Sequence, residues 1–189
     1  MTRTAVSRVL MDLTPALLVT AIATGLVGAS RAHGASAGEK PAAVVACLTD
    51  DLTGTVAGRP RRPHPGVRDA VLQLTNTSGR TCTVQGWADI ALVTPPGELV
   101  RVPTRKVGQA VGATGILLEP QASAWSRVQW DTCDASREGC GVGVALQYIV
   151  DPDSTGAVAD LTAVPEADRA GITMTAMRVD SLQPTRPTD

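Results

Sequence analysis

Residues 71–86, with the sequence VLQLTNTSGRTCTVQG, form a strand–turn–strand pattern. Apolar and polar side chains alternate before the turn, and Ala70, Leu72 and Leu74 fall on one side. That period of two is typical of a strand with one buried face. Asn-Thr-Ser-Gly at residues 76–79 supplies turn residues, and a second strand-like run opens at Cys82. The segment therefore predicts a β-structure in which Leu72 and Leu74 face the core.

Similar strand-like runs occupy most of the chain on both sides of this segment. They are Val44–Leu48, Leu52–Ala57, Asp69–Asn76, Cys82–Thr94, Leu99–Val102, Gly115–Glu119, Ala122–Asp131, Gly143–Val150 and Ile172–Val179. Turn residues such as Pro95–Glu98 and Asp151–Ser154 separate them. Only residues 164–170 suggest a helix, of a single turn. Short strands with frequent turns predict an all-β fold, an antiparallel sandwich or barrel.

Composition excludes several classes of partner. The chain has 189 residues, of which 43% are apolar and 19% charged, and its formal net charge is −1. One domain with short appendages fits this length. The charge argues against a basic nucleic-acid-binding protein, and an aromatic content of 2% disfavours base stacking. We expect no nucleic acid among the partners.

The N-terminus has the order of a secretory signal peptide. Arg3 and Arg8 precede the uncharged run Leu13–Ala29, and small residues follow. Cleavage after Ala37 is preferred, with Ala29 as the alternative. The apolar run is shorter than the roughly 20 residues that a membrane-spanning helix needs, so a permanent span would be marginal. We expect a secreted protein of the cell envelope without a stable membrane span after cleavage. A membrane-tethered protein with an uncleaved segment is the alternative.

These features divide the chain into four parts. They are a signal peptide (1–37), a disordered lead-in (38–43), a β-sandwich domain (44–182) and a flexible tail (183–189).

The chain has four cysteines, Cys47, Cys82, Cys133 and Cys140, all after the signal. Export to an oxidising environment favours disulfides, and four cysteines allow three pairings. The short turn between Cys133 and Cys140 suggests a local bridge, which would leave Cys47 to pair with Cys82. Zinc is disfavoured because no C-x2-C pair occurs. Val44–Cys47 also has the form of a lipobox, but lipidation of Cys47 would leave an odd number of cysteines, three, for disulfide pairing.

No motif of catalysis or metal binding stands out, and we expect no catalytic residue, cofactor or metal. His64, between two prolines, is the candidate base of a hydrolase, yet no G-x-S-x-G motif accompanies it. Asp151, Asp153 and Gly156 resemble part of a calcium loop, but a β-turn explains them better.

Two further features are surface candidates. The arginines near His64 could meet an anionic envelope polymer or phosphate, although a solvated loop is the simpler interpretation. They are Arg59, Arg61, Arg62 and Arg68. Asn76-Thr77-Ser78 is a formal glycosylation sequon that a tight turn also explains.

Three segments resemble the family called domain of unknown function 4232, which comprises secreted or envelope-anchored proteins of actinobacteria. Residues 71–86 resemble its hallmark, Cys47–Leu52 its opening element, and Leu118–Ala124 its Leu-x-Pro-Gly-x-x-Ala turn; Trp130 and the following Cys resemble a later strand. Ala88 and Gln121 depart from the pattern. The resemblance spans about residues 44–153 and implies an immunoglobulin-like β-sandwich with a Cys47–Cys82 bridge. It implies no catalytic residue.

Taken together, the sequence predicts an exported, disulfide-stabilised, non-enzymatic binding or accessory module. Its expected partner is a cell-envelope polymer or protein, and its ligand is open. An exported hydrolase that uses His64 is the alternative in a different class.

Overall fold

A computed structural model describes residues 44–59, 64–110, 112 and 115–188 of the chain. The predicted signal peptide, its cleavage sites and the lead-in lie outside the described residues, as do Arg61 and Arg62. No helix in the described part of the chain is long and apolar enough to cross a membrane.

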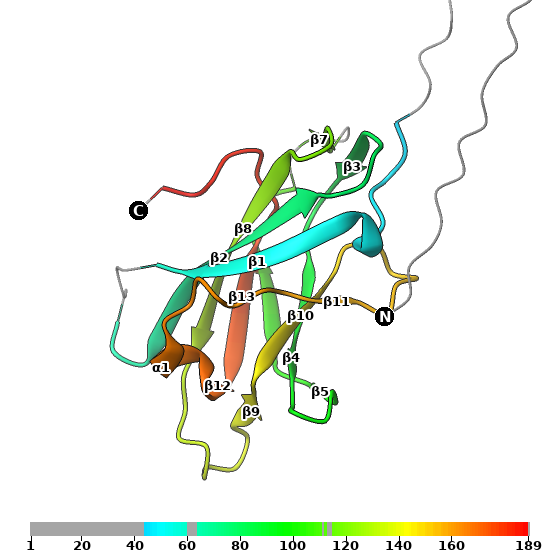
Figure 1. The fold of residues 1–189 in the computed structure, drawn as a ribbon. Helices are drawn as coiled ribbons and strands as arrows, with labels where there is room; N and C mark the ends of the chain where they lie inside the picture. Colours follow the sequence, from blue (N-terminus) through cyan, green and yellow to red (C-terminus); the bar gives the residue numbers. More distant parts are fainter. Residues whose placement is uncertain (1–43, 60–63, 111, 113–114, 189) are drawn as a thin grey trace, which may run out of the picture. The chain divides into compact units, whose positions relative to one another are not determined.

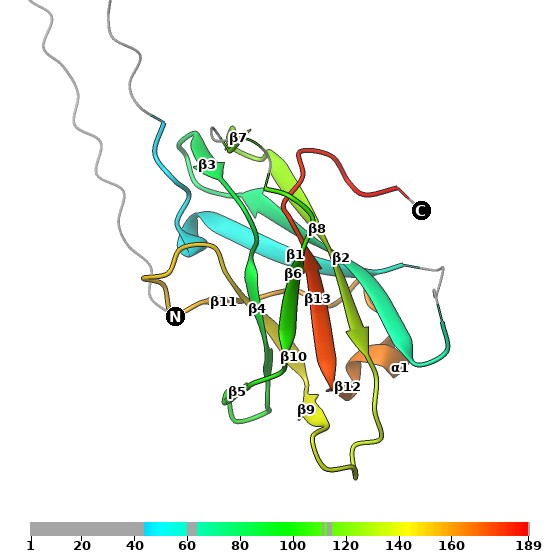
Figure 2. The same cartoon turned by 180° about the vertical axis from the view of Figure 1, so that it is seen from behind.

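The larger sheet has five strands in the order β1-β2-β8-β13-β6. Their bounds are Leu52–Gly58 (β1), Val67–Asn76 (β2), Ser123–Asp131 (β8), Ala176–Asp180 (β13) and Thr104–Val107 (β6). Neighbouring strands are antiparallel, except that β13 and β6 run parallel. Figure 2 shows β13 between β6 and β8.

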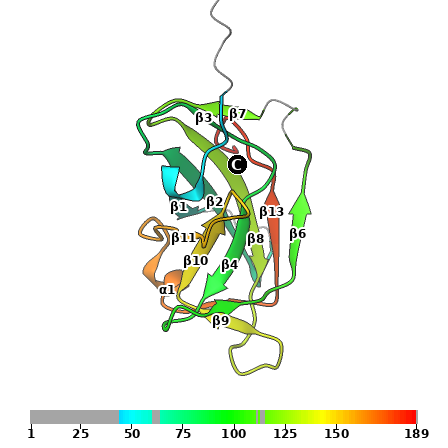
Figure 3. The same cartoon turned by 90° about the vertical axis from the view of Figure 1, so that its right-hand side faces the viewer.

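A four-stranded sheet, in the order β11-β10-β4-β5, lies opposite the larger one (Figures 1 and 3). Its strands are Ala157–Val158 (β11), Ala145–Ile149 (β10), Asp89–Val93 (β4) and Leu99–Val100 (β5). Two short pairs complete the fold: β9 (Gly141–Gly143) with β12 (Ile172–Met174), and β3 (Cys82–Val84) with β7 (Ile116–Leu118). A 3-10 turn covers Thr49–Asp51, and α1 covers Glu166–Arg169.

The core lies between the two larger sheets. Alternate residues of β2 and β8, among them Leu72, Leu74 and Val128, are fully buried, and Leu92 and Leu146 meet them from the second sheet. Burial alternates without a break along β8. The all-β sandwich is confirmed, whereas the immunoglobulin-like strand arrangement stays a prediction.

Several predicted strands have different bounds. The run Val44–Leu48 makes only one isolated bridge, between Ala46 and Thr83. The run Cys82–Thr94 divides into β3 and β4, because Gly86 adopts a φ of 75° that extended backbone does not allow.

The last two runs are interrupted as well. Val144 separates β9 from β10, and Thr175 separates β12 from β13 by donating its N–H to the Asp131 carbonyl. The sequence did not predict β6 and β11, whereas the single helical turn near residue 166 is confirmed. Gln183, the first residue of the predicted tail, exchanges two backbone hydrogen bonds with Trp125, so ordered pairing continues past residue 182.

Candidate functional site

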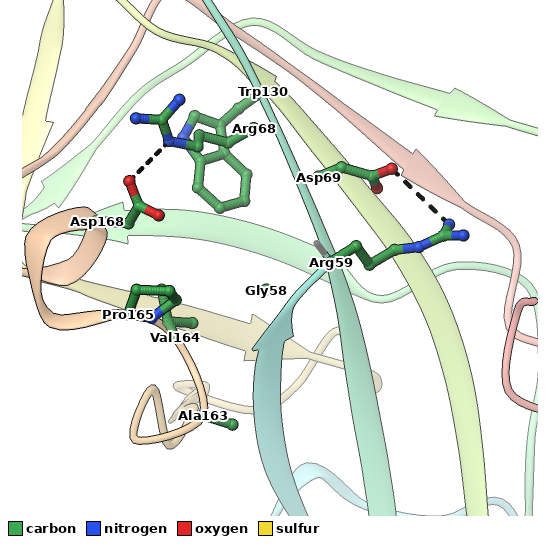
Figure 4. Close-up of a pocket in the computed structure, with 9 residues that line it drawn as sticks. All are labelled: Gly58, Arg59, Arg68, Asp69, Trp130, Ala163, Val164, Pro165 and Asp168. Atoms are coloured by element: carbon green, nitrogen blue, oxygen red, sulfur yellow. Dashed lines mark hydrogen bonds and ion pairs between the residues drawn. The ribbon is translucent and has the colours of Figure 1, made fainter. Parts of the chain in front are cut away.

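A pocket of about 250 Å³ lies where β1 and β2 meet the segment that leads into α1 (Figure 4). We call it the Trp130 pocket. Its lining residues are Gly58, Arg59, Arg68, Asp69, Trp130, Ala163, Val164, Pro165 and Asp168. The pocket thus combines apolar walls with the Arg68–Asp168 pair, whereas the side chains of Arg59 and Asp69 pair with each other and point away from Trp130 (Figure 4).

Strand register places Trp130 and Arg68 side by side. The two residues are Cα partners in the β2–β8 pair, and Trp130 is only 5% exposed. The neighbouring Val128 points into the core, so Trp130 occupies the end of the same inward-facing row. The indole therefore forms a fixed apolar surface next to the guanidinium of Arg68, as Figure 4 shows.

An ion pair crosses the pocket between strand and helix. Nε of Arg68 donates to Oδ1 of Asp168 at 2.9 Å. The backbone of Asp168 is held in place because the carbonyl of Pro165, the residue before α1, accepts its N–H. The two side chains are 28% and 14% exposed, so the pair is partly desolvated but still reachable by a ligand.

A second hollow of about 240 Å³ shares Arg68, Trp130 and Asp168 with the first. Thr132, Cys133, Gly171, Ile172 and Thr173 complete its lining. Residues common to both hollows are the ion pair and the indole, which therefore lie at the boundary between them. A ligand that displaced Asp168 from Arg68 would gain access to both.

The other charged cluster has a structural role. Asp69 is buried on β2, and Arg127 on β8 donates to both of its carboxylate oxygens, at 2.9 and 2.5 Å. Nη1 of Arg59 lies 3.8 Å from Oδ2 of Asp69, and Nη2 of Arg59 donates to the Thr188 carbonyl. The sequence favoured a solvated loop for the arginine cluster, with an anion-binding patch as the alternative. Arg59 and Arg68 are instead paired with carboxylates, and the Arg59 side chain is only 8% exposed.

The cysteines form the two bridges Cys47–Cys82 and Cys133–Cys140. The first is the pairing that the family resemblance implied, and the second is the local bridge that the short turn suggested. No cysteine of the described residues is free. Among the described residues, no group of three His, Cys, Asp or Glu side chains could hold a metal ion.

The remaining candidates are surface or turn residues. His64 is exposed, and its ring makes no hydrogen bond to a serine or carboxylate of the described residues. Oδ2 of Asp151 accepts the N–H and hydroxyl of Thr49, while Oδ1 accepts the N–H of Asp153. Asp151 therefore connects its turn to Thr49 at the start of the domain by hydrogen bonds. This agrees with the prediction of a β-turn at Asp151 and Asp153.

The sequon is also a turn. The Asn76 side chain is buried, and its Nδ2 donates to the carbonyls of Arg80 and Leu118. Its Oδ1 accepts the N–H and hydroxyl of Ser78. Asn76 thus organises the turn after β2 and presents no accessible amide for glycosylation.

The sequence did not reveal the Trp130 pocket. In the sequence, Arg68 belonged to an arginine cluster and Trp130 to a predicted strand. Asp168 had no predicted role. Arg68 and Asp168 are 100 residues apart, so no local motif connects them. The volume is slightly below the roughly 300–1,000 Å³ of pockets for small molecules, and it suits a small group presented by a larger partner.

Comparison with known proteins identifies one family. No curated protein and no solved structure matches the chain. A family model, described as "Domain of unknown function (DUF4232)", matches residues 47–183, which is well over half of the chain. The match begins at Cys47 of the long disulfide and ends at Gln183, the residue paired with Trp125. The chain therefore belongs to the family DUF4232.

Proposed function

We propose that the protein is an exported, non-enzymatic binding module of the cell envelope, and that the Trp130 pocket holds the group it recognises. The observation that carries the proposal is a preformed pocket in which an indole lies beside a partly exposed ion pair between Arg68 and Asp168. Fixed apolar walls with a few polar groups are typical of binding sites. We expect a small, partly apolar group that also carries hydrogen-bonding atoms for the pair.

The two disulfides support a location outside the cytoplasm. Disulfides persist in oxidising compartments and are rare in the reducing cytosol. The basic start, the apolar run and the small residues before residue 38 support export independently. N-terminal sequencing of protein recovered from the culture medium should begin at Gly38 or Ser30. Retention of Met1 would contradict cleavage and would favour the membrane-tethered alternative.

Filling the pocket tests the binding proposal. Ala163 is exposed at the rim, so Ala163→Trp should block the pocket without disturbing the core. Ala135, in the exposed loop closed by Cys133–Cys140, is the matched position for a control, Ala135→Trp. Immobilised mature protein is incubated with solubilised envelope fractions, and the retained material is quantified. We expect retention by wild type and Ala135→Trp, and a loss of at least about tenfold with Ala163→Trp. Equal retention by all three proteins would contradict the role of the pocket.

His64 provides the test of the enzymatic alternative. A hydrolase that uses its imidazole as base would lose activity with His64→Ala. A binding module should retain the same envelope material with and without His64. We expect retention by His64→Ala to equal that of wild type.

A further inference from the structure

Two cross-strand rows on the outer face of the five-stranded sheet carry uncharged polar side chains around Trp125. The first row is Thr55, Gln73, Trp125 and Gln183, which are successive partners across β1, β2, β8 and the C-terminal segment. The second row, Thr53, Thr75 and Ser123, lies next to it. We call these seven residues the Trp125 surface. All face away from the core, because side chains alternate between the faces of a strand and Ala124, Leu72 and Leu74 are buried.

Hydrogen bonds between the side chains fix this surface. Nε2 of Gln73 donates to Oγ of Ser123 at 3.0 Å, and the hydroxyls of Thr75 and Ser123 lie 2.9 Å apart. Nε2 of Gln183 donates to Oγ of Ser181 at 2.9 Å. The amide and hydroxyl groups are therefore ordered before any ligand arrives, which lowers the entropic cost of binding.

Trp125 differs from the other two tryptophans. Trp87 donates its indole N–H to the Val107 carbonyl at 2.7 Å, and Trp130 is buried in its pocket. Trp125 is partly exposed, and its indole N–H makes no hydrogen bond to a described residue. A partly exposed aromatic ring with an unused donor is suited to a ligand that has both C–H and hydroxyl groups.

The charge of the surface restricts the ligand further. None of its seven residues is ionisable. The buried carboxylate on the same face, Asp69, is neutralised by Arg127. The seven residues offer no cation to a nucleic acid or an anionic polymer, and Arg127, two residues from Trp125 on the same face of β8, is paired with Asp69. A protein partner would need a larger apolar centre than one indole provides.

We propose that the Trp125 surface binds a neutral polysaccharide. The C–H face of a sugar ring would pack on the indole, since the aromatic face is electron-rich and C–H edges carry partial positive charge. Side-chain amides and hydroxyls of the two rows would bond the sugar hydroxyls. Four adjacent strand positions span about 14 Å, which exceeds one sugar ring and allows contact with linked units. The surface shares no residue with the Trp130 pocket, so the two binding proposals can be tested independently, and one can be wrong while the other is right.

Calorimetric titration of the mature protein with cellohexaose, laminarihexaose and maltohexaose tests this proposal, with polygalacturonate as an anionic probe. At least one neutral hexasaccharide should bind, with an affinity insensitive to salt. Trp125→Ala should weaken it at least about tenfold. Gln73→Ala should weaken it about threefold, and it serves as a second variant because Gln73 bonds only to neighbouring surface hydroxyls.

The control is Gln129→Ala, on the outer face of the same strand but in the row of Asp69. Its affinity should equal that of wild type. Unchanged affinity in both Trp125→Ala and Gln73→Ala, with all variants folded by circular dichroism, would overturn the proposal. Binding of polygalacturonate alone, or of no hexasaccharide at millimolar concentration, would overturn it as well.

Discussion

The hydroxyl of Tyr148 on β10 donates a hydrogen bond of 2.7 Å to the carbonyl of Leu52 on β1. The bond connects the two larger sheets through the core, and Tyr148 is only 2% exposed. The ring passes directly over Gly54, where a Cβ would lie 2.4 Å from Cε1 of the tyrosine. This single aromatic residue therefore determines how closely β1 can approach the second sheet.

Gly54→Ala should destabilise the fold. The added methyl group cannot coexist with the Tyr148 ring, so either the ring or β1 must move. Overpacking of this kind costs about 1–3 kcal/mol. Urea denaturation, monitored by tryptophan fluorescence, measures the loss. Gly79→Ala is the control, because no atom lies within 4 Å of the corresponding Cβ. An equal effect of both substitutions would show that the close contact is unimportant.

The two disulfides should contribute unequally to stability. Cys47–Cys82 closes a loop with a sequence separation of 35, whereas Cys133–Cys140 closes one of 7. Loop-closure entropy gives about 3.8 kcal/mol for the long loop and about 2.5 kcal/mol for the short one. We expect Cys47→Ser/Cys82→Ser to lower the free energy of unfolding more than Cys133→Ser/Cys140→Ser. Peptide mapping without reduction should recover the two pairs. A Cys47–Cys140 crosslink would contradict the fold.

Asp69 should matter far more than a carboxylate in an exposed pair. Its side chain is 2% exposed, and its neutralisation would remove a buried negative charge that both Arg59 and Arg127 face. We expect Asp69→Asn to cost about 3 kcal/mol. Asp89, which pairs with Lys106 at the surface, is the control, and Asp89→Asn should cost less than about 1 kcal/mol. Comparable losses in urea denaturation would refute the distinction.

Asp151 should make stability depend on pH. Hydrogen bonds from Thr49, above all from its backbone N–H, lower the pKa of Asp151 below its ordinary value of 3.8. Because the folded pKa lies below the unfolded one, the carboxylate's stabilisation of the fold is fully present above the unfolded pKa and disappears as pH falls through the folded value. Asp151→Asn should therefore destabilise the protein near neutral pH and much less in acid.

The measurement is urea denaturation between about pH 6 and pH 2.5. Asp153→Asn, in the same exposed turn, is the control, because the Asp153 carboxylate accepts no hydrogen bond from a described residue. An Asp151→Asn protein whose stability falls as steeply in acid as that of wild type would disprove the assignment.

Local patterns predicted the strands that have one buried face. The alternation in β2 identified Leu72 and Leu74 as core residues, because a period of two places alternate side chains on one face whatever the strand pairs with. The turn at Asn76 and the bridge between Cys133 and Cys140 also depend on neighbours in sequence. Such features could be predicted because their physical causes are local.

Long-range contacts determined the rest. The parallel pairing of β6 with β13, the pocket between Arg68 and Asp168, and the row that joins Trp125 to Gln183 all depend on segments distant in sequence. The interruption of β3–β4 at Gly86 also escaped the sequence pattern, since an apolar run does not indicate a positive φ. The residues alone therefore determined which side chains turn inward. Only the packing of the two sheets decided which charges meet, because a charged or aromatic side chain selects its partner from whatever the strand register brings beside it.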